Sequence, residues 1–115
     1  MRSLITTHVL DTARGKPAVG VDVILESYTP TKEWKELARG KTDADGRIID
    51  LLPESVTIVP GTYRLTFLIQ EYFRSTGQEG FYPYIPVVFR LAGPVTHYHV
   101  PLLVSPYGYS TYRGS

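Results

Sequence analysis

Histidines lie at two places in the chain where short strands are expected. His97 and His99 are two residues apart, a spacing that places both imidazoles on one face of a strand. His8 lies within another apolar segment, where it shares a strand face with Thr6 and Leu10. Because imidazole titrates near neutral pH, such a set of histidines can act as acid and base or can bind a metal.

A zinc site with an open coordination position is one interpretation of His8, His97 and His99. No acidic residue adjoins these histidines in the sequence to support a metal. Chance pairing on a solvated strand face is the favoured interpretation of the spacing, with the zinc site as the lesser alternative.

Residues 42–46, with the sequence Thr-Asp-Ala-Asp-Gly, resemble the start of a calcium-binding loop. The glutamate that closes such a loop is absent after Gly46, so an ordinary turn is predicted instead. Asp favours the turn and glycine supplies a positive φ angle. The turn places Arg47 at the start of a strand, as a surface charge or as a group that polarises a carbonyl or holds an anion.

The last thirteen residues, 103–115, are rich in tyrosine and contain β-branched residues that favour a strand. Chain ends are usually frayed, so this composition predicts a structured terminus that forms part of a site. Ser105 and Ser110 do not lie in a Gly-x-Ser-x-Gly motif, which makes a serine nucleophile a weak interpretation. Hydroxyls that hydrogen-bond a substrate or a water are the better one.

The 115 residues are enough for a single domain, residues 1–115, with a modest core. The net charge of +1 gives no electrostatic reason to expect nucleic acid or an anionic membrane as a partner. The absence of cysteine excludes disulfides and thiolate chemistry. Neither a signal sequence nor an apolar run of about 20 residues is found, so a soluble, cytoplasmic protein is expected.

Short segments of β character, separated by turns, must position these residues. Strands are predicted over 4–10, 21–28, 34–42, 47–51, 62–69, 85–91, 97–103 and 109–112. A loop is predicted over 11–17 and one short helix over 70–75. This spacing of short strands predicts a β-sandwich.

Three ordered segments add a family resemblance that covers essentially the whole chain. They are residues 6–18 (TTHVLDTARGKPA), residues 42–47 (TDADGR), and the stretch from 97–103 (HYHVPLL) to the terminal 112–115 (YRGS). Together they resemble the transthyretin-related family of 5-hydroxyisourate hydrolases, of which the terminal tetrapeptide is the hallmark.

The resemblance implies an all-β, transthyretin-like sandwich of two four-stranded sheets with one short helix. It also implies a homotetramer, built as a dimer of dimers with active sites at the dimer–dimer interface. The implied reaction is the hydrolysis of 5-hydroxyisourate to 2-oxo-4-hydroxy-4-carboxy-5-ureidoimidazoline in urate catabolism. No metal or organic cofactor is implied.

Matching the motifs residue by residue assigns catalytic roles to His8, Arg47 and His99. His97 points to the same face as His99 and is expected to have only a supporting role. The residues implied to bind substrate are His8, Arg47, Ser110, Tyr112, Arg113, Gly114 and Ser115.

Three other functions compete with this one. A non-catalytic binder on the same fold needs an apolar channel and has no use for His8, Arg47 and His99 together. A metal-dependent cyclic-amide hydrolase would use the three histidines. A structural module of a larger assembly would have no need of the C-terminal residues.

Overall fold

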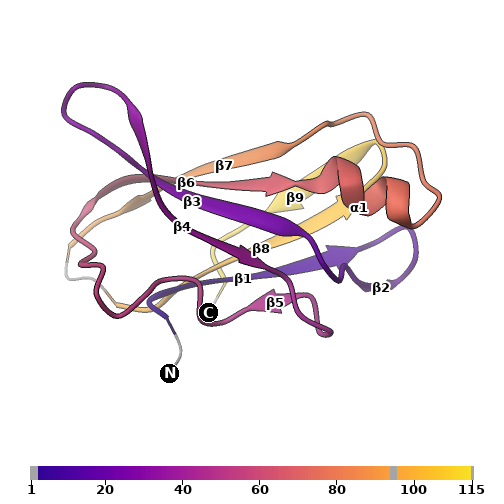
Figure 1. The fold of residues 1–115 in the computed structure, drawn as a ribbon, viewed down its shortest axis with the longest axis horizontal. Helices are drawn as coiled ribbons and strands as arrows, with labels where there is room; N and C mark the ends of the chain where they lie inside the picture. The colour runs from indigo at the N-terminus through magenta and orange to yellow at the C-terminus, as the bar shows by residue number, and fades with distance from the viewer. Residues whose placement is uncertain (1–2, 94–95, 115) are drawn as a thin grey trace.

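The computed structural model describes residues 3–93 and 96–114. In this part of the chain nine strands form two stacked sheets, and one helix follows the sixth strand (Figure 1). The elements in chain order are β1 (Ile5–Asp11), β2 (Lys16–Pro17), β3 (Asp22–Tyr28), β4 (Trp34–Lys41), β5 (Arg47–Ile48), β6 (Gly61–Leu68), α1 (Ile69–Ser75), β7 (Ile85–Leu91), β8 (Tyr98–Ser105) and β9 (Gly108–Thr111).

The first sheet is built around β1. Its strands follow the order β2-β1-β8-β9, and β5 also pairs with β1, beside β2. The pairing of β1 with β8 is parallel, whereas the other pairs in this sheet are antiparallel. The second sheet has the order β4-β3-β6-β7 and is antiparallel throughout.

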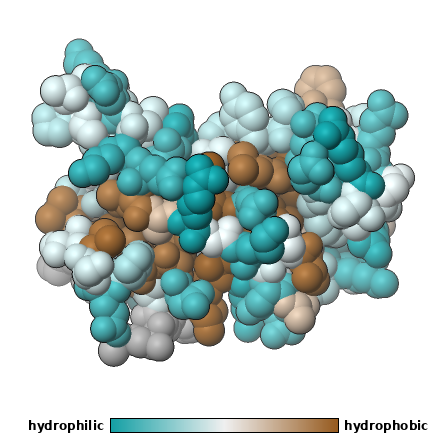
Figure 2. All heavy atoms as spheres, in the orientation of Figure 1, coloured by the Kyte–Doolittle hydropathy of each residue, from teal (hydrophilic) through white to brown (hydrophobic). Residues whose placement is uncertain are grey.

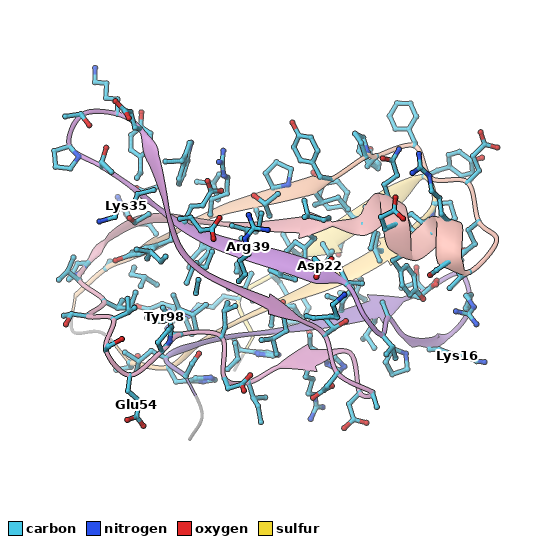
Figure 3. All side chains as sticks on the ribbon, viewed as in Figure 1. Lys16, Asp22, Lys35, Arg39, Glu54 and Tyr98 are labelled. Atoms are coloured by element: carbon cyan, nitrogen blue, oxygen red, sulfur yellow. The ribbon has the colours of Figure 1, made fainter. Side chains whose placement is uncertain are left out.

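Alternating apolar side chains on both sheets meet in one core. Val23 and Leu25 on β3, Leu65 and Phe67 on β6, and Leu102 on β8 are all 0% exposed. The charged residues labelled on β3 and β4 in Figure 3 point outward and are exposed. Figure 2 shows hydrophobic residues gathered across the middle of one face, with hydrophilic residues around them. Burial of apolar area on facing sheets is therefore what holds the two layers together.

The predicted sandwich and its short helix are confirmed, with two differences in the first sheet. This sheet has five strands where four were expected, because β2 forms within the predicted loop 11–17 and pairs with the end of β1. The strand predicted over 47–51 is limited to Arg47–Ile48, and the chain leaves the sheet after Ile48. The predicted helix is present and begins one residue earlier, at Ile69.

No helix among the described residues has the length and apolar character needed to cross a membrane.

A buried carboxylate joins the helix to the first sheet. Asp11, the last residue of β1, is 0% exposed. Its side chain accepts hydrogen bonds from the Tyr72 hydroxyl on α1 at 2.7 Å and from the Gln78 amide at 3.2 Å. Burial acts to raise the pKa of Asp11, but these donors and two backbone N–H groups outweigh it and hold the pKa below its ordinary value. The ionised carboxylate is therefore stabilised by folding.

Replacing Tyr72 with Phe is expected to lower the free energy of unfolding by about 2 kcal/mol near neutral pH, because it removes a hydrogen bond to a charged group. The lowered pKa of Asp11 contributes stability that is complete above the ordinary carboxyl value of 3.8 and is lost as the pH falls through the folded-state value. The difference between wild type and Tyr72→Phe should therefore shrink in acid, which denaturant unfolding at several pH values measures.

Tyr63→Phe is the matched control, because the Tyr63 hydroxyl donates to the neutral backbone carbonyl of Val59. The loss of unfolding free energy caused by Tyr63→Phe should stay the same over the acid range. A cost of Tyr72→Phe that is equally independent of pH would contradict the assignment to the Asp11 carboxylate.

Candidate active site

Strand pairing brings the three predicted catalytic residues to the outer face of the first sheet. Residues directly opposite each other in paired strands point to the same face, as do alternate residues within one strand. Arg47 on β5 is paired with His8 on β1, and His99 on β8 is paired with Thr6, two residues before His8. His8, Arg47 and His99 therefore share one face, although they come from three separate strands.

The turn over residues 43–46 fixes the position of Arg47. The Asp43 side chain accepts hydrogen bonds from the backbone N–H groups of Asp45 at 2.9 Å and Arg47 at 3.0 Å. These donors hold the pKa of Asp43 below its ordinary value. Gly46 has a φ angle of 76°, and a Cβ atom there would lie 2.5 Å from the carbonyl oxygen of Val9. The predicted turn is confirmed, and its close approach to β1 sets Arg47 beside His8.

Thr6 contacts both His97, just before β8, and His99, the second residue of β8, a role that the sequence did not reveal. Its hydroxyl lies 2.8 Å from Nδ1 of His99 and 3.0 Å from Nε2 of His97. Thr6 is 1% exposed, and the two imidazole rings are nearly parallel, with centroids 6.4 Å apart. The shared strand face of Thr6 and His8 was visible in the sequence, but the pairing of β1 with β8 was not.

The C-terminal segment returns to His99. The backbone N–H of Gly114 donates to the carbonyl oxygen of His99 at 2.8 Å. A Cβ atom on Gly114 would lie 2.7 Å from Cδ2 of the His99 ring. Glycine therefore allows the chain to pass directly against the imidazole and to restrict where the ring can lie.

Two more of the predicted binding residues lie on the same face as Gly114. Ser110 on β9 is paired with Leu103 on β8. Ser110, Tyr112 and Gly114 are alternate residues of an extended segment, so they lie on one face. The side chains of Ser110 and Tyr112 are exposed, Tyr112 at 60%. Ser115, the remaining predicted binding residue at the terminus, lies outside the described residues.

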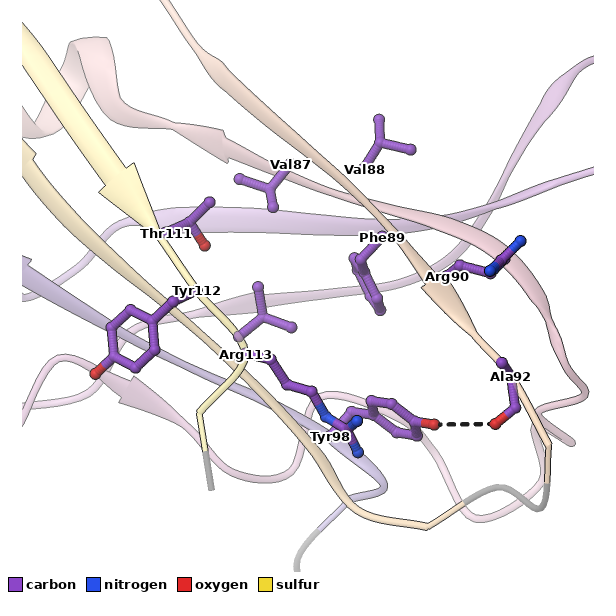
Figure 4. A pocket seen from close by; sticks show the side chains of 10 residues that line it. Val87, Val88, Phe89, Arg90, Ala92, Tyr98, Thr111, Tyr112 and Arg113 are labelled. Carbon is purple, nitrogen blue, oxygen red and sulfur yellow. Dashed lines mark hydrogen bonds between the residues drawn. The ribbon is translucent and has the colours of Figure 1, made fainter.

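Arg113 is placed apart from this group. Its guanidinium lies over the ring of Tyr98, 4.5 Å from the ring centre, beside a cavity of about 350 Å³ between β7 and the end of β9 (Figure 4). Tyr98 and His99 are adjacent on β8 and therefore point to opposite faces. Tyr112 points away from Arg113 in the same view. The structure thus does not bring the Arg113 side chain to His8, Arg47 and His99.

The three-histidine zinc interpretation finds no ligand cluster in the structure. Within residues 3–93 and 96–114, no three His, Asp or Glu side chains lie close enough together to hold one metal ion. Ring nitrogens of His97 and His99 are instead directed at the Thr6 hydroxyl.

The shared face combines two kinds of chemistry. His8 and His99 are half-buried imidazoles that can take up or release a proton. Arg47 is an exposed, permanently charged group that can stabilise negative charge on an oxygen. Such a combination suits the addition of water to a polarised carbonyl.

Comparisons with known proteins agree on one family. The model of the HIUase/Transthyretin family matches residues 5–114. A curated relative from Mus musculus named 5-hydroxyisourate hydrolase is 49% identical over 114 residues, which cover 98% of this chain and 96% of the relative.

Two solved structures share the fold. A structure of Klebsiella pneumoniae 5-hydroxyisourate hydrolase has a TM-score of 0.81 and 34% identity and covers 96% of this chain and 98% of its own. Sea bream transthyretin in complex with thyroxine has a TM-score of 0.90 and 31% identity and covers 97% of this chain and 95% of its own.

Gly114→Ala is expected to displace the His99 ring, because the added Cβ atom would approach Cδ2 of the ring to 2.7 Å. The free energy of unfolding should change by less than about 1 kcal/mol, since alanine at a compatible backbone position is itself mildly stabilising. Imidazole ¹H–¹⁵N chemical shifts measure the ring displacement, and thermal unfolding measures stability.

Gly108→Ala is the matched control on β9. A Cβ atom at Gly108 has its nearest neighbour at 3.8 Å, an ordinary contact with Ser105. Unchanged His99 shifts in Gly114→Ala would show that the terminal segment does not confine the ring.

Proposed function

The chain belongs to the HIUase/transthyretin family, and we propose that it is a 5-hydroxyisourate hydrolase whose residues 1–115 form one hydrolase domain. The proposal is carried by the shared face of His8, Arg47 and His99, which provides proton transfer and charge stabilisation together. The 49% identity to a relative named for this activity supports the same conclusion.

In the proposed reaction, water adds to a ring carbonyl of 5-hydroxyisourate and the bond from that carbon to the ring nitrogen breaks. The ring nitrogen takes up a proton and the carbonyl becomes a carboxylate, which gives 2-oxo-4-hydroxy-4-carboxy-5-ureidoimidazoline, as expected for a step of urate catabolism. Water is a weak nucleophile, so a base with a pKa near neutrality is needed. The imidazoles of His8 and His99 orient the water and remove its proton.

Arg47 stabilises the negative charge that develops on the attacked oxygen. Its guanidinium keeps its charge throughout the reaction, and the strand pairing with His8 keeps it next to the proposed base. Tyr112, Ser110 and the backbone of Gly114 bind other polar groups of the ring. Arg113 and Ser115 remain predicted binding residues. The Arg113 side chain lies over the ring of Tyr98, and Ser115 lies outside the described residues.

We further propose a homotetramer, a dimer of dimers in which the outer face of the first sheet lies at the dimer–dimer interface. The exposed ring of Tyr112 on that face supports this, because tyrosine is enriched at interfaces. The cytoplasmic location stays a prediction of the sequence.

A non-catalytic ligand binder is the second candidate. It is favoured by the TM-score of 0.90 to transthyretin in complex with thyroxine, against 0.81 to the bacterial hydrolase. Backbone similarity does not decide between the two, because function depends on the side chains placed on the fold. The imidazole and guanidinium groups favour hydrolysis.

The purified protein, after treatment with a chelator, is expected to accelerate the decay of 5-hydroxyisourate generated freshly from urate by urate oxidase. The absorbance decay without protein is the control, because the compound also decays spontaneously. Loss of activity on chelation would support the metal-dependent alternative. No acceleration by folded protein would favour the non-catalytic binder.

Two substitutions test the proposed roles. Arg47→Gln and His99→Ala should each lower kcat/KM by about 100-fold, through loss of charge stabilisation and of a general base respectively. Arg39→Gln is the control. Arg39 is an exposed arginine on β4, in the second sheet, where it forms a salt bridge with Glu36 of the same strand. Full activity of either site variant would remove that residue from the mechanism.

A further inference from the structure

The Thr6 hydroxyl lies between two imidazole nitrogens, and it can donate its single proton to only one of them. Thr6 Oγ1 is within hydrogen-bond distance of Nδ1 of His99 and Nε2 of His97, at 2.8 and 3.0 Å. At 1% exposure, Thr6 has little access to water, and these are the partners of its hydroxyl among the described residues. A hydroxyl has one proton to donate and lone pairs that accept.

When both histidines are neutral, two arrangements satisfy this hydroxyl. In the first, His99 Nδ1–H donates to Thr6, and Thr6 donates to the Nε2 lone pair of His97. In the second, His97 Nε2–H donates to Thr6, and Thr6 donates to the Nδ1 lone pair of His99. Since a neutral imidazole carries only one N–H, the first gives His99 a basic Nε2, and the second gives it an Nε2–H.

We propose that Thr6 is a positioning residue that holds neutral His99 in its Nδ1–H form, with His97 as the acceptor that makes this form favourable. The consequence for catalysis rests on the proposed function, since a base that accepts a proton from water needs the lone pair on Nε2. The side chain of Thr6 itself does not touch the substrate, because its hydroxyl is occupied between the two rings.

The direction of the two hydrogen bonds through Thr6 follows from the role proposed for His99. The contact of Nδ1 with the Thr6 hydroxyl fixes which edge of the His99 ring faces Thr6, and Gly114 lies beside the other edge, at Cδ2. A positioned ring with a fixed tautomer is what a general base requires. A proton gained by His97 at Nε2 would make that nitrogen a donor to Thr6, and the Thr6 hydroxyl could then donate only to Nδ1 of His99. Neutral His99 would have to carry its single proton on Nε2 instead, and it would lose the lone pair that a base needs there.

Other charged and titratable groups share this face and belong to the same electrostatic environment. Among the described residues they include His8 on β1, Arg47 on β5 with Asp43 in the turn before it, and Tyr112 after β9. The tautomer measurement separates the relay from their influence, because it reports on each ring nitrogen individually.

The test is a ¹H–¹⁵N correlation spectrum of the imidazoles in the full-length protein at a pH well above the ordinary imidazole pKa of about 6.5. Wild type should show His99 as the Nδ1–H form and His97 with an unprotonated Nε2. Thr6→Val, which removes the hydroxyl but keeps the branched shape, should shift His99 toward the Nε2–H form. Thr6→Ser should retain the wild-type pattern.

Two further variants sharpen the test. His97→Phe removes the acceptor, so the Thr6 hydroxyl should donate to His99 and convert it to the Nε2–H form. Thr7→Val is the matched control: Thr7 is the adjacent residue on β1, is 0% exposed, and donates instead to the backbone carbonyl of Val100 at 2.6 Å. It should leave the His99 tautomer unchanged.

Kinetics with 5-hydroxyisourate give a second readout. Thr6→Val and His97→Phe should lower kcat by about 10- to 100-fold with little change in KM, as losses of partners that orient a functional imidazole do. Thr6→Ser and Thr7→Val should keep kcat near the wild-type value.

The outcomes are distinguishable from failure of the proposed function. Wild-type His99 in the Nε2–H form, or an unchanged His99 tautomer in Thr6→Val, would overturn the inference whatever the activity. An active enzyme whose kcat is unaffected by Thr6→Val would also overturn it. The expected tautomers in a protein that does not hydrolyse 5-hydroxyisourate would support the Thr6 relay and refute only the proposed function.

Discussion

The parallel pairing of β1 with β8 is the constraint on which the site depends. It sets Thr6 opposite His99, and the pairing of β5 with the other edge of β1 sets Arg47 opposite His8. The opposite face of β1 points into the core, and Ile5 on that face is 0% exposed. Because side chains alternate, a slip of one residue would bring the core side chains to the surface and carry the site residues inward. Burial of the core therefore fixes the register that the chemistry requires.

The sequence predicted those parts of the site that local geometry determines. The common side of His97 and His99 follows from a spacing of two residues, and the position of Arg47 follows from the turn that precedes it. The partnership of Thr6 with both histidines depends on which distant strands pair and in which register, and spacing along the chain contains no such information. Arg113 shows the same limit: its strand alternation takes it to Tyr98, on the opposite side from His99. The short strand β2 was missed because two residues carry too little pattern to distinguish a strand from a loop.

One backbone is shared by proteins whose names indicate different functions. The sandwich resembles both a thyroxine complex of transthyretin and a bacterial 5-hydroxyisourate hydrolase. The core face of β1 and β8 is mostly apolar, with Thr7 and Asp11 as buried polar members, while the outer face presents His8, His99 and, from β5, Arg47. Substitutions on the outer face can change the chemistry while the core keeps the layers packed, because adjacent residues of a strand belong to different environments.

The strand order also determines when the site can form as the chain is synthesised. The second sheet pairs β3, β4, β6 and β7, all of which precede β8 in the sequence, so its strands are available before β8 and β9 are made. The first sheet instead joins β1, at the start of the chain, to β8 and β9, near its end. A nascent chain that has not yet released β8 from the ribosome leaves one edge of β1 without its partner, and that unpaired edge is open to aggregation. The face that carries His8, Arg47 and His99 is therefore the last part of the sandwich whose strands become available, and a translation product interrupted before β8 lacks His99 altogether.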